Sequence, residues 1–133
     1  MRKINERSNI KELVTRFYAT IKKDELLGPI FLQMLPTDEI WASHLEKLTD
    51  FWKTNLFHVI KFEGNPMEAH QRTDKKSEFS ITQDHYYHWL MIWNKTIDGL
   101  FEGEKAELAK EKARRMSTHL YLNMWKHKPK TTE

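Results

Sequence analysis

The stretch Asn9–Ile21, NIKELVTRFYATI, decides the class of fold. Its apolar residues recur at steps of three and four, which places them on one face of an α-helix. They are Ile10, Leu13, Val14, Phe17, Tyr18 and Ile21. Asn9 is placed to cap this helix, with Glu12 at the third position, as in a capping box. The face predicted to be buried therefore carries a phenol hydroxyl.

The same periodicity returns in the rest of the chain. Helix starts are expected at Pro36-Thr37-Asp38-Glu39, at Thr82 and near Glu104, the last helix running to about His127. The inner faces contain Trp41, Leu45, Leu48, Trp52 and Leu56, then Tyr86, Trp89, Leu90, Trp93, Ile97, Leu100 and Phe101, then Leu108, Ala109, Ala113, Met116, Leu120 and Met124. Gly28-Pro29 interrupts the pattern before a short apolar run. An all-α fold is predicted.

Between the second and third long helices the pattern fades. Asn65 and Pro66 can cap and open a one-turn helix that ends near His70, and the polar stretch 71–80 should be a loop. So short a helix has little intrinsic structure to hold a histidine in place. Another interaction should therefore fix His70.

Composition predicts one domain with an aromatic core. The chain has 133 residues, of which 39% are apolar, and only four glycines and four prolines are available for turns. It also has five Trp, seven Phe, four Tyr and six Met, which suit a core of flat and polarizable side chains. We expect a single domain over residues 1–133, with an ordered core of about residues 9–127 and short polar tails.

Charge and hydropathy argue against a nucleic acid or a membrane as partner. The net charge is +3, but basic residues alternate with acidic ones: Glu107 precedes Lys110, and Glu111 precedes Arg114 and Arg115, at the spacing of helix-surface ion pairs. There is no apolar run of about 18 residues and no secretory signal, so a cytoplasmic protein is expected. The absence of cysteine excludes disulfides and thiol chemistry.

The familiar catalytic and metal-binding motifs do not occur in the sequence. Seven histidines are present, but there is no His-Glu-x-x-His, and no histidine has an acidic residue three positions before it. His85 and His88 are best read as an exposed polar pair. No serine lies in a Gly-x-Ser-x-Gly turn and no glycine-rich loop could hold a phosphate, which argues against conventional hydrolase and nucleotide chemistry.

Three polar side chains do fall on predicted buried faces, namely Tyr18, His44 and Trp89. Each alone has an ordinary explanation as a core tyrosine, a histidine at a helix edge or a space-filling indole. Together with His70 they suit a flat iron macrocycle, which needs an apolar slot, one imidazole to bind the metal, and polar groups on the opposite side. His70 could be the axial ligand and the other three the opposing set.

As a combination these residues resemble the truncated haemoglobins of group III (P). The resemblance depends on FYATIKKDELLGPIF (17–31), WASHLEKLTDFW (41–52), GNPMEAH (64–70) and HWLMIW (88–93), and it covers about residues 10–127. The Gly-Gly turns of groups I and II are missing, which fits group III. The resemblance implies a shortened globin fold, a two-over-two helical sandwich, with haem b as cofactor.

The resemblance also implies roles for individual residues. His70 is the proximal iron ligand, and Tyr18, His44 and Trp89 form the distal ligand pocket. Phe31, Leu48 and Trp52 are expected to contact the haem. Arg72, with Lys75 and Lys76, could meet the propionates, although a solvated loop explains these cations equally well.

The implied ligands are O2, NO, CO or peroxide. Donors such as Tyr18 and Trp89 would slow oxygen release, which favours redox use, as in NO detoxification or peroxidase-like turnover with an electron-donor reductase, over simple delivery. Oxygen storage or transport and haem-based sensing are the alternatives within the family. A haem-free helical interaction module remains the alternative outside it.

Overall fold

The computed structural model describes residues 1–57 and 82–127, with side chains to residue 122. Within these ranges the elements are α1 (Arg7–Lys23), α2 (Gly28–Met34), α3 (Asp38–Phe57), α5 (Gln83–Leu100) and α6 (Glu104–His127). The expected starts of α3, α5 and α6 are confirmed. The expected one-turn helix ending near His70, and the loop after it, lie outside the described residues.

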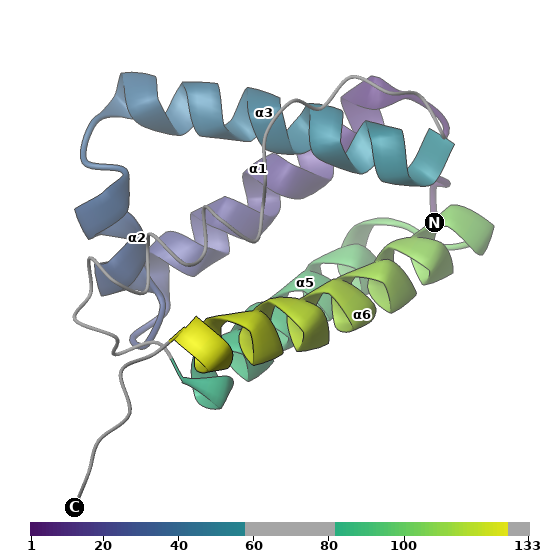
Figure 1. Cartoon of the computed structure of the whole chain (residues 1–133). Helices are drawn as coiled ribbons and strands as arrows, with labels where there is room; N and C mark the ends of the chain where they lie inside the picture. The colour runs from purple at the N-terminus through teal and green to yellow at the C-terminus, as the bar shows by residue number, and fades with distance from the viewer. Residues whose placement is uncertain (58–81, 128–133) are drawn as a thin grey trace, which may run out of the picture.

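The helices form two crossed pairs (Figure 1). Helix α1 packs along α3 in one pair and α5 packs along α6 in the other, while α1 also crosses α5 and α3 touches α6. The core fills the space between the pairs, and its largest fully buried side chains are Trp93 and Phe17. The all-α, two-over-two sandwich predicted from the sequence is confirmed.

Helix α1 buries the face that its periodicity predicts, but it begins earlier than predicted. All six apolar residues are buried. The helix starts at Arg7, with Glu6 as N-cap, so the prediction that Asn9 is the cap is wrong. Asn9 is instead the third helical residue, and its Oδ1 accepts from the backbone N–H groups of Asn5 and Glu6 at 3.0 and 3.1 Å. The box forms three residues upstream because the Asn9 side chain reaches back to those free donors.

The segment before α1 is part of the packed structure. Ile4 is only 2% exposed and lies in the core. The backbone N–H of Glu102 donates to the Arg2 carbonyl oxygen at 2.9 Å, and the Arg2 guanidinium makes two contacts with the Glu12 carboxylate at 3.0 and 2.6 Å. Packing therefore begins well before residue 9 and joins the start of the chain to the α5–α6 turn.

The corner between α1 and α2 is closed by a carboxylate and a glycine. Asp24 Oδ2 accepts from the backbone N–H groups of Leu26 and Leu27 at 3.0 and 2.8 Å. A Cβ atom on Gly28 would lie 2.7 Å from the Lys22 carbonyl oxygen, a separation that no side chain tolerates without movement. The close approach of α2 to the end of α1 therefore requires glycine at position 28.

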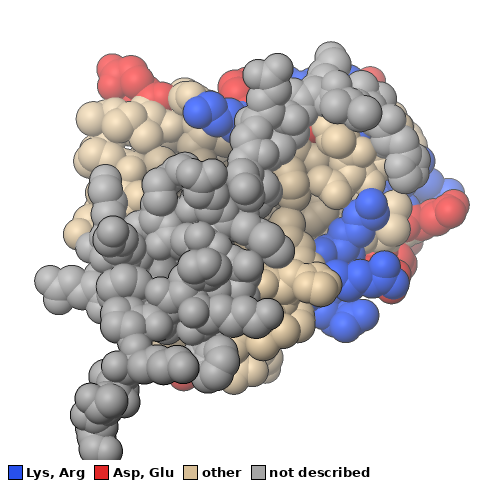
Figure 2. Space-filling view, in the orientation of Figure 1, with Lys and Arg blue, Asp and Glu red and all other residues tan. Residues whose placement is uncertain are grey.

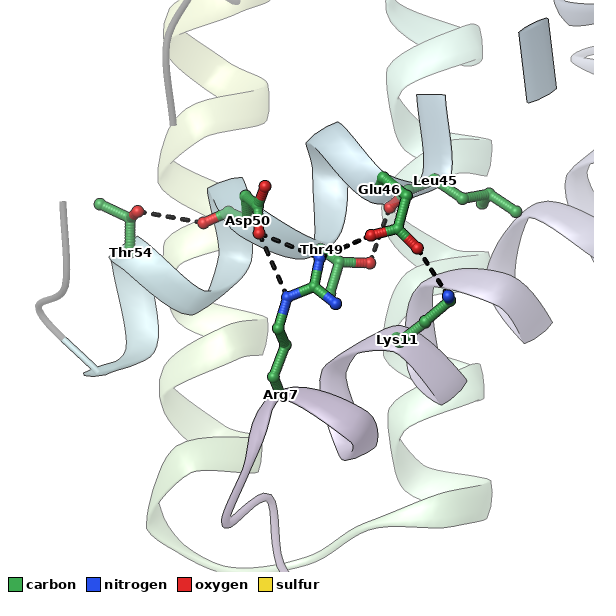
Figure 3. A network of polar contacts seen from close by, with 7 residues as sticks. All are labelled: Arg7, Lys11, Leu45, Glu46, Thr49, Asp50 and Thr54. Atoms are coloured by element: carbon green, nitrogen blue, oxygen red, sulfur yellow. Dashed lines mark hydrogen bonds and ion pairs between the residues drawn. The ribbon is translucent and has the colours of Figure 1, made fainter. Parts of the chain in front are cut away.

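A network of charges joins the start of α1 to the middle of α3 (Figure 3). Arg7 pairs with Glu46 at 2.7 Å and with Asp50 at 3.0 Å, and Lys11 pairs with Glu46 at 2.6 Å. Beside it, the hydroxyl of the fully buried Thr49 donates to the Leu45 carbonyl at 2.7 Å. The network fixes how α3 lies on α1, and α3 carries His44 one turn before Thr49.

In the second pair, α5 is capped at its start, a turn joins α5 to α6, and a buried hydrogen bond links the two helices. Thr82 caps α5 as predicted, in a reciprocal box in which its backbone N–H donates to His85 Nδ1 at 2.9 Å, so His85 has a structural role. Gly103, at φ 100°, turns the chain into α6. The buried Trp93 indole N–H donates to the Ala109 carbonyl at 3.2 Å.

The surface of α6 carries ion pairs of the kind that its sequence predicts. Lys110 contacts Glu107 at 3.0 Å and Asp98 at 2.7 Å, and Arg115 contacts Glu111 at 2.6 Å. Figure 2 shows basic side chains gathered over the first half of α6 with acidic ones beside them. No helix within residues 1–57 and 82–127 is both long enough and apolar enough to cross a membrane.

Candidate functional site

Tyr18 is the centre of a buried aromatic cluster that joins α1, α2, α3 and α5. Its side chain is 6% exposed, and its ring centroid lies 5.6 Å from Phe31, 5.8 Å from Trp41 and 5.0 Å from His44. Each of these rings meets it edge to face. We call Tyr18, Phe31, Trp41, His44 and Trp89 the Tyr18 cluster.

Trp89 completes the cluster from α5. It is half-buried and meets Phe17 edge to face at a centroid distance of 5.5 Å, and Phe17 in turn meets Tyr18 at 4.7 Å. Burial raises the pKa of Tyr18 above its ordinary value of 10.0, and the contact with Trp89 offsets part of that rise. Tyr18 is therefore a neutral phenol at physiological pH.

The chemistry of the two side chains leaves the phenol hydrogen available. An indole nitrogen can only donate, whereas a phenol can both donate and accept. Trp89 therefore does not compete for the hydroxyl hydrogen of Tyr18, which Tyr18 can donate to a ligand.

His44 reaches the cluster from α3, where it is half-buried. Its ring lies edge to face on Tyr18 and on Trp41, the latter at a centroid distance of 6.1 Å. Because Trp41 and His44 are three residues apart, they share one side of α3. The structure thus brings together all three polar residues that the sequence predicts for the distal side, and it adds Trp41, whose spacing from His44 was the available signal.

Phe31 enters the cluster from α2. Its half-buried ring packs on Tyr18, and its centroid lies 6.5 Å from that of Trp41. The Gly28 corner sets this position, because it directs α2 back along the end of α1. The proximity of Phe31 to Tyr18 is a property of this corner, and the expected contact of Phe31 with haem stays a prediction.

Leu48 and Trp52 lie further along α3 than the Tyr18 cluster. Leu48 is half-buried against the core. Trp52 is 3% exposed and stacks on Trp93, with centroids 4.6 Å apart and planes inclined at 24°. The structure thus places Trp52 with the core indoles of α5. Its expected haem contact stays a prediction.

A cation that the sequence did not single out lies over the cluster. Lys22 Nζ is 4.2 Å from the ring centroid of Trp41, which is a cation–π contact. Lys22 belongs to the last turn of α1, where a cation also interacts favourably with the helix dipole. The contact holds Trp41 against the corner that positions Phe31.

The expected proximal side lies outside the described residues. His70 and Arg72 both fall between residues 58 and 81. Within the described ranges, no group of three or more His, Asp or Glu side chains could by itself hold a metal ion. The assignments of His70 as iron ligand and Arg72 as propionate partner therefore stay predictions.

The fold is that of a truncated globin. The structure is similar to the crystal structure of a group III truncated haemoglobin from Campylobacter jejuni, with a TM-score of 0.84 and 23% sequence identity. That likeness covers 98% of this chain and all of the other. The truncated globin fold expected from the sequence is confirmed.

Sequence comparison leads to the same class. The chain is 26% identical over 125 residues to the curated Campylobacter jejuni protein "Group 3 truncated hemoglobin ctb", covering 93% of this chain and 94% of that protein. No protein-family model matches the chain. The resemblance to group III truncated haemoglobins is thereby confirmed along nearly the whole sequence.

Proposed function

We propose that this protein is a haem globin that binds O2 and other diatomic ligands beside Tyr18, and that it uses the bound ligand in redox chemistry. Its haem would be haem b, with His70 as the proximal ligand. The observation that carries the proposal is the burial of the Tyr18 phenol, whose ring is enclosed by Phe31, Trp41 and His44. The similar Campylobacter jejuni protein is named a haemoglobin.

The described residues fit the distal side of a haem by their chemistry. Phe31 and Trp41 supply flat apolar surfaces against Tyr18, and Tyr18 and His44 supply polar groups beside them, with Trp89 adding an indole N–H. Haem supplies an iron atom at which O2, NO, CO or peroxide can bind. The role of the chain is to hold the ligand, to exclude water and to supply protons.

Tyr18 holds the ligand in this proposal. Bound O2 carries partial negative charge, and a hydrogen bond to a charged group is worth about 1.5–3 kcal/mol. By the rule of tenfold per 1.4 kcal/mol, a donor of this strength slows ligand release by about tenfold to a hundredfold. The donor is preorganised because four surrounding rings fix the phenol before a ligand arrives.

This arrangement suits redox chemistry on the bound ligand better than it suits oxygen transport. A ligand retained by a strong donor leaves too slowly for efficient transport, whereas a donor beside a bound peroxide can provide a proton as the O–O bond breaks. His44 lies next to Tyr18, and an imidazole can both accept and donate a proton, so it can return that proton. We therefore propose NO detoxification or peroxidase-like turnover, supplied with electrons by a reductase, as the use of this site.

Spectroscopy of the purified protein tests the proposal. Haemin added to the chain should give a Soret band and distinct ferric, ferrous and CO spectra. His70→Ala should change the iron ligation, while His119→Ala, on the exposed side of α6, should leave the spectra unchanged. A chain that takes up no haemin would contradict the proposal and favour the haem-free interaction module.

Turnover experiments separate redox use from storage. Ferrous-oxy protein mixed with NO should be converted rapidly to the ferric form, and ferric protein with peroxide and a reducing dye should turn over. Tyr18→Phe should slow the peroxide reaction because the proton donor is lost. Oxygen binding without either reaction would favour storage.

A further inference from the structure

Three tryptophans form a continuous column through the core. Trp89 and Trp93 have ring centroids 6.1 Å apart and planes only 5° from parallel. Trp93 and Trp52 follow at 4.6 Å and 24°. We call Trp89, Trp93 and Trp52 the indole column. Trp89, at one end, is half-buried and belongs to the Tyr18 cluster. Trp52, at the other end on α3, is 3% exposed.

Neighbouring groups hold the column in register. Phe17, itself 1% exposed, meets Trp89 and Trp93 edge to face at 5.5 and 5.0 Å, and it meets Tyr18 at 4.7 Å. The Trp93 indole N–H is fixed on the Ala109 carbonyl. Offset or edge-on aromatic pairs are common in cores. A run of three near-parallel indoles that starts beside a buried phenol is a less common arrangement than such a pair.

We propose that the indole column is a path for single electrons, which carries an oxidising equivalent from the ligand site to Trp52. This inference depends on the proposed haem function. Indole is among the most easily oxidised side chains in proteins, and electron transfer falls off steeply with distance. Stacked rings at 6.1 and 4.6 Å therefore give a much faster route than solvent or backbone.

The electron balance is simple. Hydrogen peroxide reduced at the ligand site takes up two electrons and two protons, its O–O bond breaks, and two water molecules leave. A bound haem would supply one of these electrons, and Trp89 supplies the other and becomes an indole radical cation. Trp93 then returns an electron to Trp89, and Trp52 returns one to Trp93. The electron vacancy ends on Trp52, and the two protons come from solvent by way of His44 and Tyr18, which regains the proton that it gives.

Tyr18 is the less suitable first carrier although it lies closer to the other polar groups of its cluster. A phenol must release its proton when it is oxidised, and burial disfavours loss of that proton from Tyr18. An indole can keep its N–H and hold the positive charge. The column therefore draws the oxidising equivalent away from Tyr18 and leaves its hydroxyl intact for the next ligand.

Electron paramagnetic resonance on the haem-loaded ferric protein tests this path. The protein is mixed with hydrogen peroxide and frozen rapidly, with either ordinary or ring-deuterated tryptophan incorporated. A radical whose hyperfine structure narrows on deuteration is expected. Peptide mass spectrometry should then find oxygen added to Trp93 and Trp52, which bulk oxidants cannot reach because these side chains are 1% and 3% exposed.

Variants locate the path. Trp93→Phe keeps an apolar ring but breaks the column, so Trp52 should no longer be oxidised and oxidation should be found at Trp89. Oxidation of Trp52 that persists in Trp93→Phe would show that Trp52 is oxidised directly from the haem, and it would exclude the column as the path. Tyr121→Phe changes an aromatic side chain that packs on Tyr86, outside both the column and the Tyr18 cluster, and should leave Trp52 oxidation unchanged. If Trp93→Phe does not fold, Trp52→Phe can be used instead. In that variant the added oxygen should be found on Trp93.

Other outcomes would overturn the inference. A radical insensitive to tryptophan deuteration, or oxidation confined to exposed side chains such as Met91 and Tyr87 with intact buried indoles, excludes the column as a path. Failure to bind haem would instead remove the proposed function. Peroxide consumption with no tryptophan radical would remove the path and leave the proposed function standing.

Discussion

Phe17 on α1 meets the indole of Trp89 on α5 edge to face, with ring centroids 5.5 Å apart, at the crossing of the two helix pairs. The next residue, Tyr18, lies 5.0 Å from the ring of His44 on α3. These residues are far apart in sequence, and no single helix could bring them together. The chemistry of the site therefore depends on the crossing itself.

Removing the Tyr18 hydroxyl should speed oxygen release. In Tyr18→Phe the off-rate of O2 from the ferrous protein should rise by about tenfold to a hundredfold, because a hydrogen bond of about 1.5–3 kcal/mol is lost. Stopped-flow spectroscopy measures it. Tyr87→Phe makes the same change at a tyrosine that is 60% exposed and should leave the rate alone. Equal rates for Tyr18→Phe and the unmodified protein would remove Tyr18 from the ligand site.

Tyr18 should make the protein less stable at alkaline pH. Its pKa is raised in the folded state, so above the ordinary pKa of 10.0 the unfolded chain loses a proton that the folded chain keeps. Below that pH the contribution to stability is fully present. Above it, the free energy of unfolding falls by up to about 1.4 kcal/mol per pH unit.

Urea unfolding between neutral and strongly alkaline pH measures this effect. Other groups also titrate there, so the informative quantity is the difference between the unmodified protein and Tyr18→Phe. The phenylalanine variant lacks the titrating group, and the stability advantage of the unmodified protein should shrink as pH rises. If the stability difference between the two proteins did not change with pH, Tyr18 would have the same pKa in the folded and the unfolded state.

The charge network between α1 and α3 should contribute modestly to stability. Arg7→Gln removes the cation shared by Glu46 and Asp50, and it should lower the free energy of unfolding by about 1 kcal/mol, the upper end for partly exposed pairs. The loss should shrink at high salt, which screens such pairs. Arg114→Gln, at an exposed position on α6, is the control. Equal effects of the two substitutions would show that the network adds nothing.

Two glycines should respond in opposite directions to the same substitution. Gly28→Ala places a methyl group 2.7 Å from the Lys22 carbonyl, and it should cost about 1–3 kcal/mol as an overpacked site. Gly99→Ala on α5 meets nothing within 4 Å, and it should stabilise by about 0.5–1 kcal/mol through helix propensity. Thermal unfolding measures both. A neutral Gly28→Ala would show that the corner can relax.

The sequence predicted the helices better than it predicted the contacts between them. Helical periodicity and the cap at Thr82 identify local structure, which nearby residues determine. The start of α1 was misplaced because Asn9 reaches back to free donors before the helix, and a sequence pattern does not distinguish a cap from a third residue that reaches back. Local sequence signals thus predict that a helix exists more reliably than they predict where it starts.

Residues outside the periodic stretches were the hardest to predict. Ile4 looks like part of a polar lead-in, and only the tertiary fold shows that it fills the core. Lys22 over Trp41 likewise depends on how α1 and α3 approach each other. The convergence of Tyr18, His44 and Trp89 was expected because the combination resembled a known family, since no spacing rule relates positions on three separate helices.

The near-parallel rings of Trp89, Trp93 and Trp52 also affect how this protein can be observed. Transition dipoles that lie so close together couple, so these chromophores do not absorb as independent units. In the far ultraviolet the coupling adds an aromatic signal to the circular dichroism of the peptide groups. Apparent helix content will therefore be biased, and the same band will report when the two halves of the sandwich separate during unfolding.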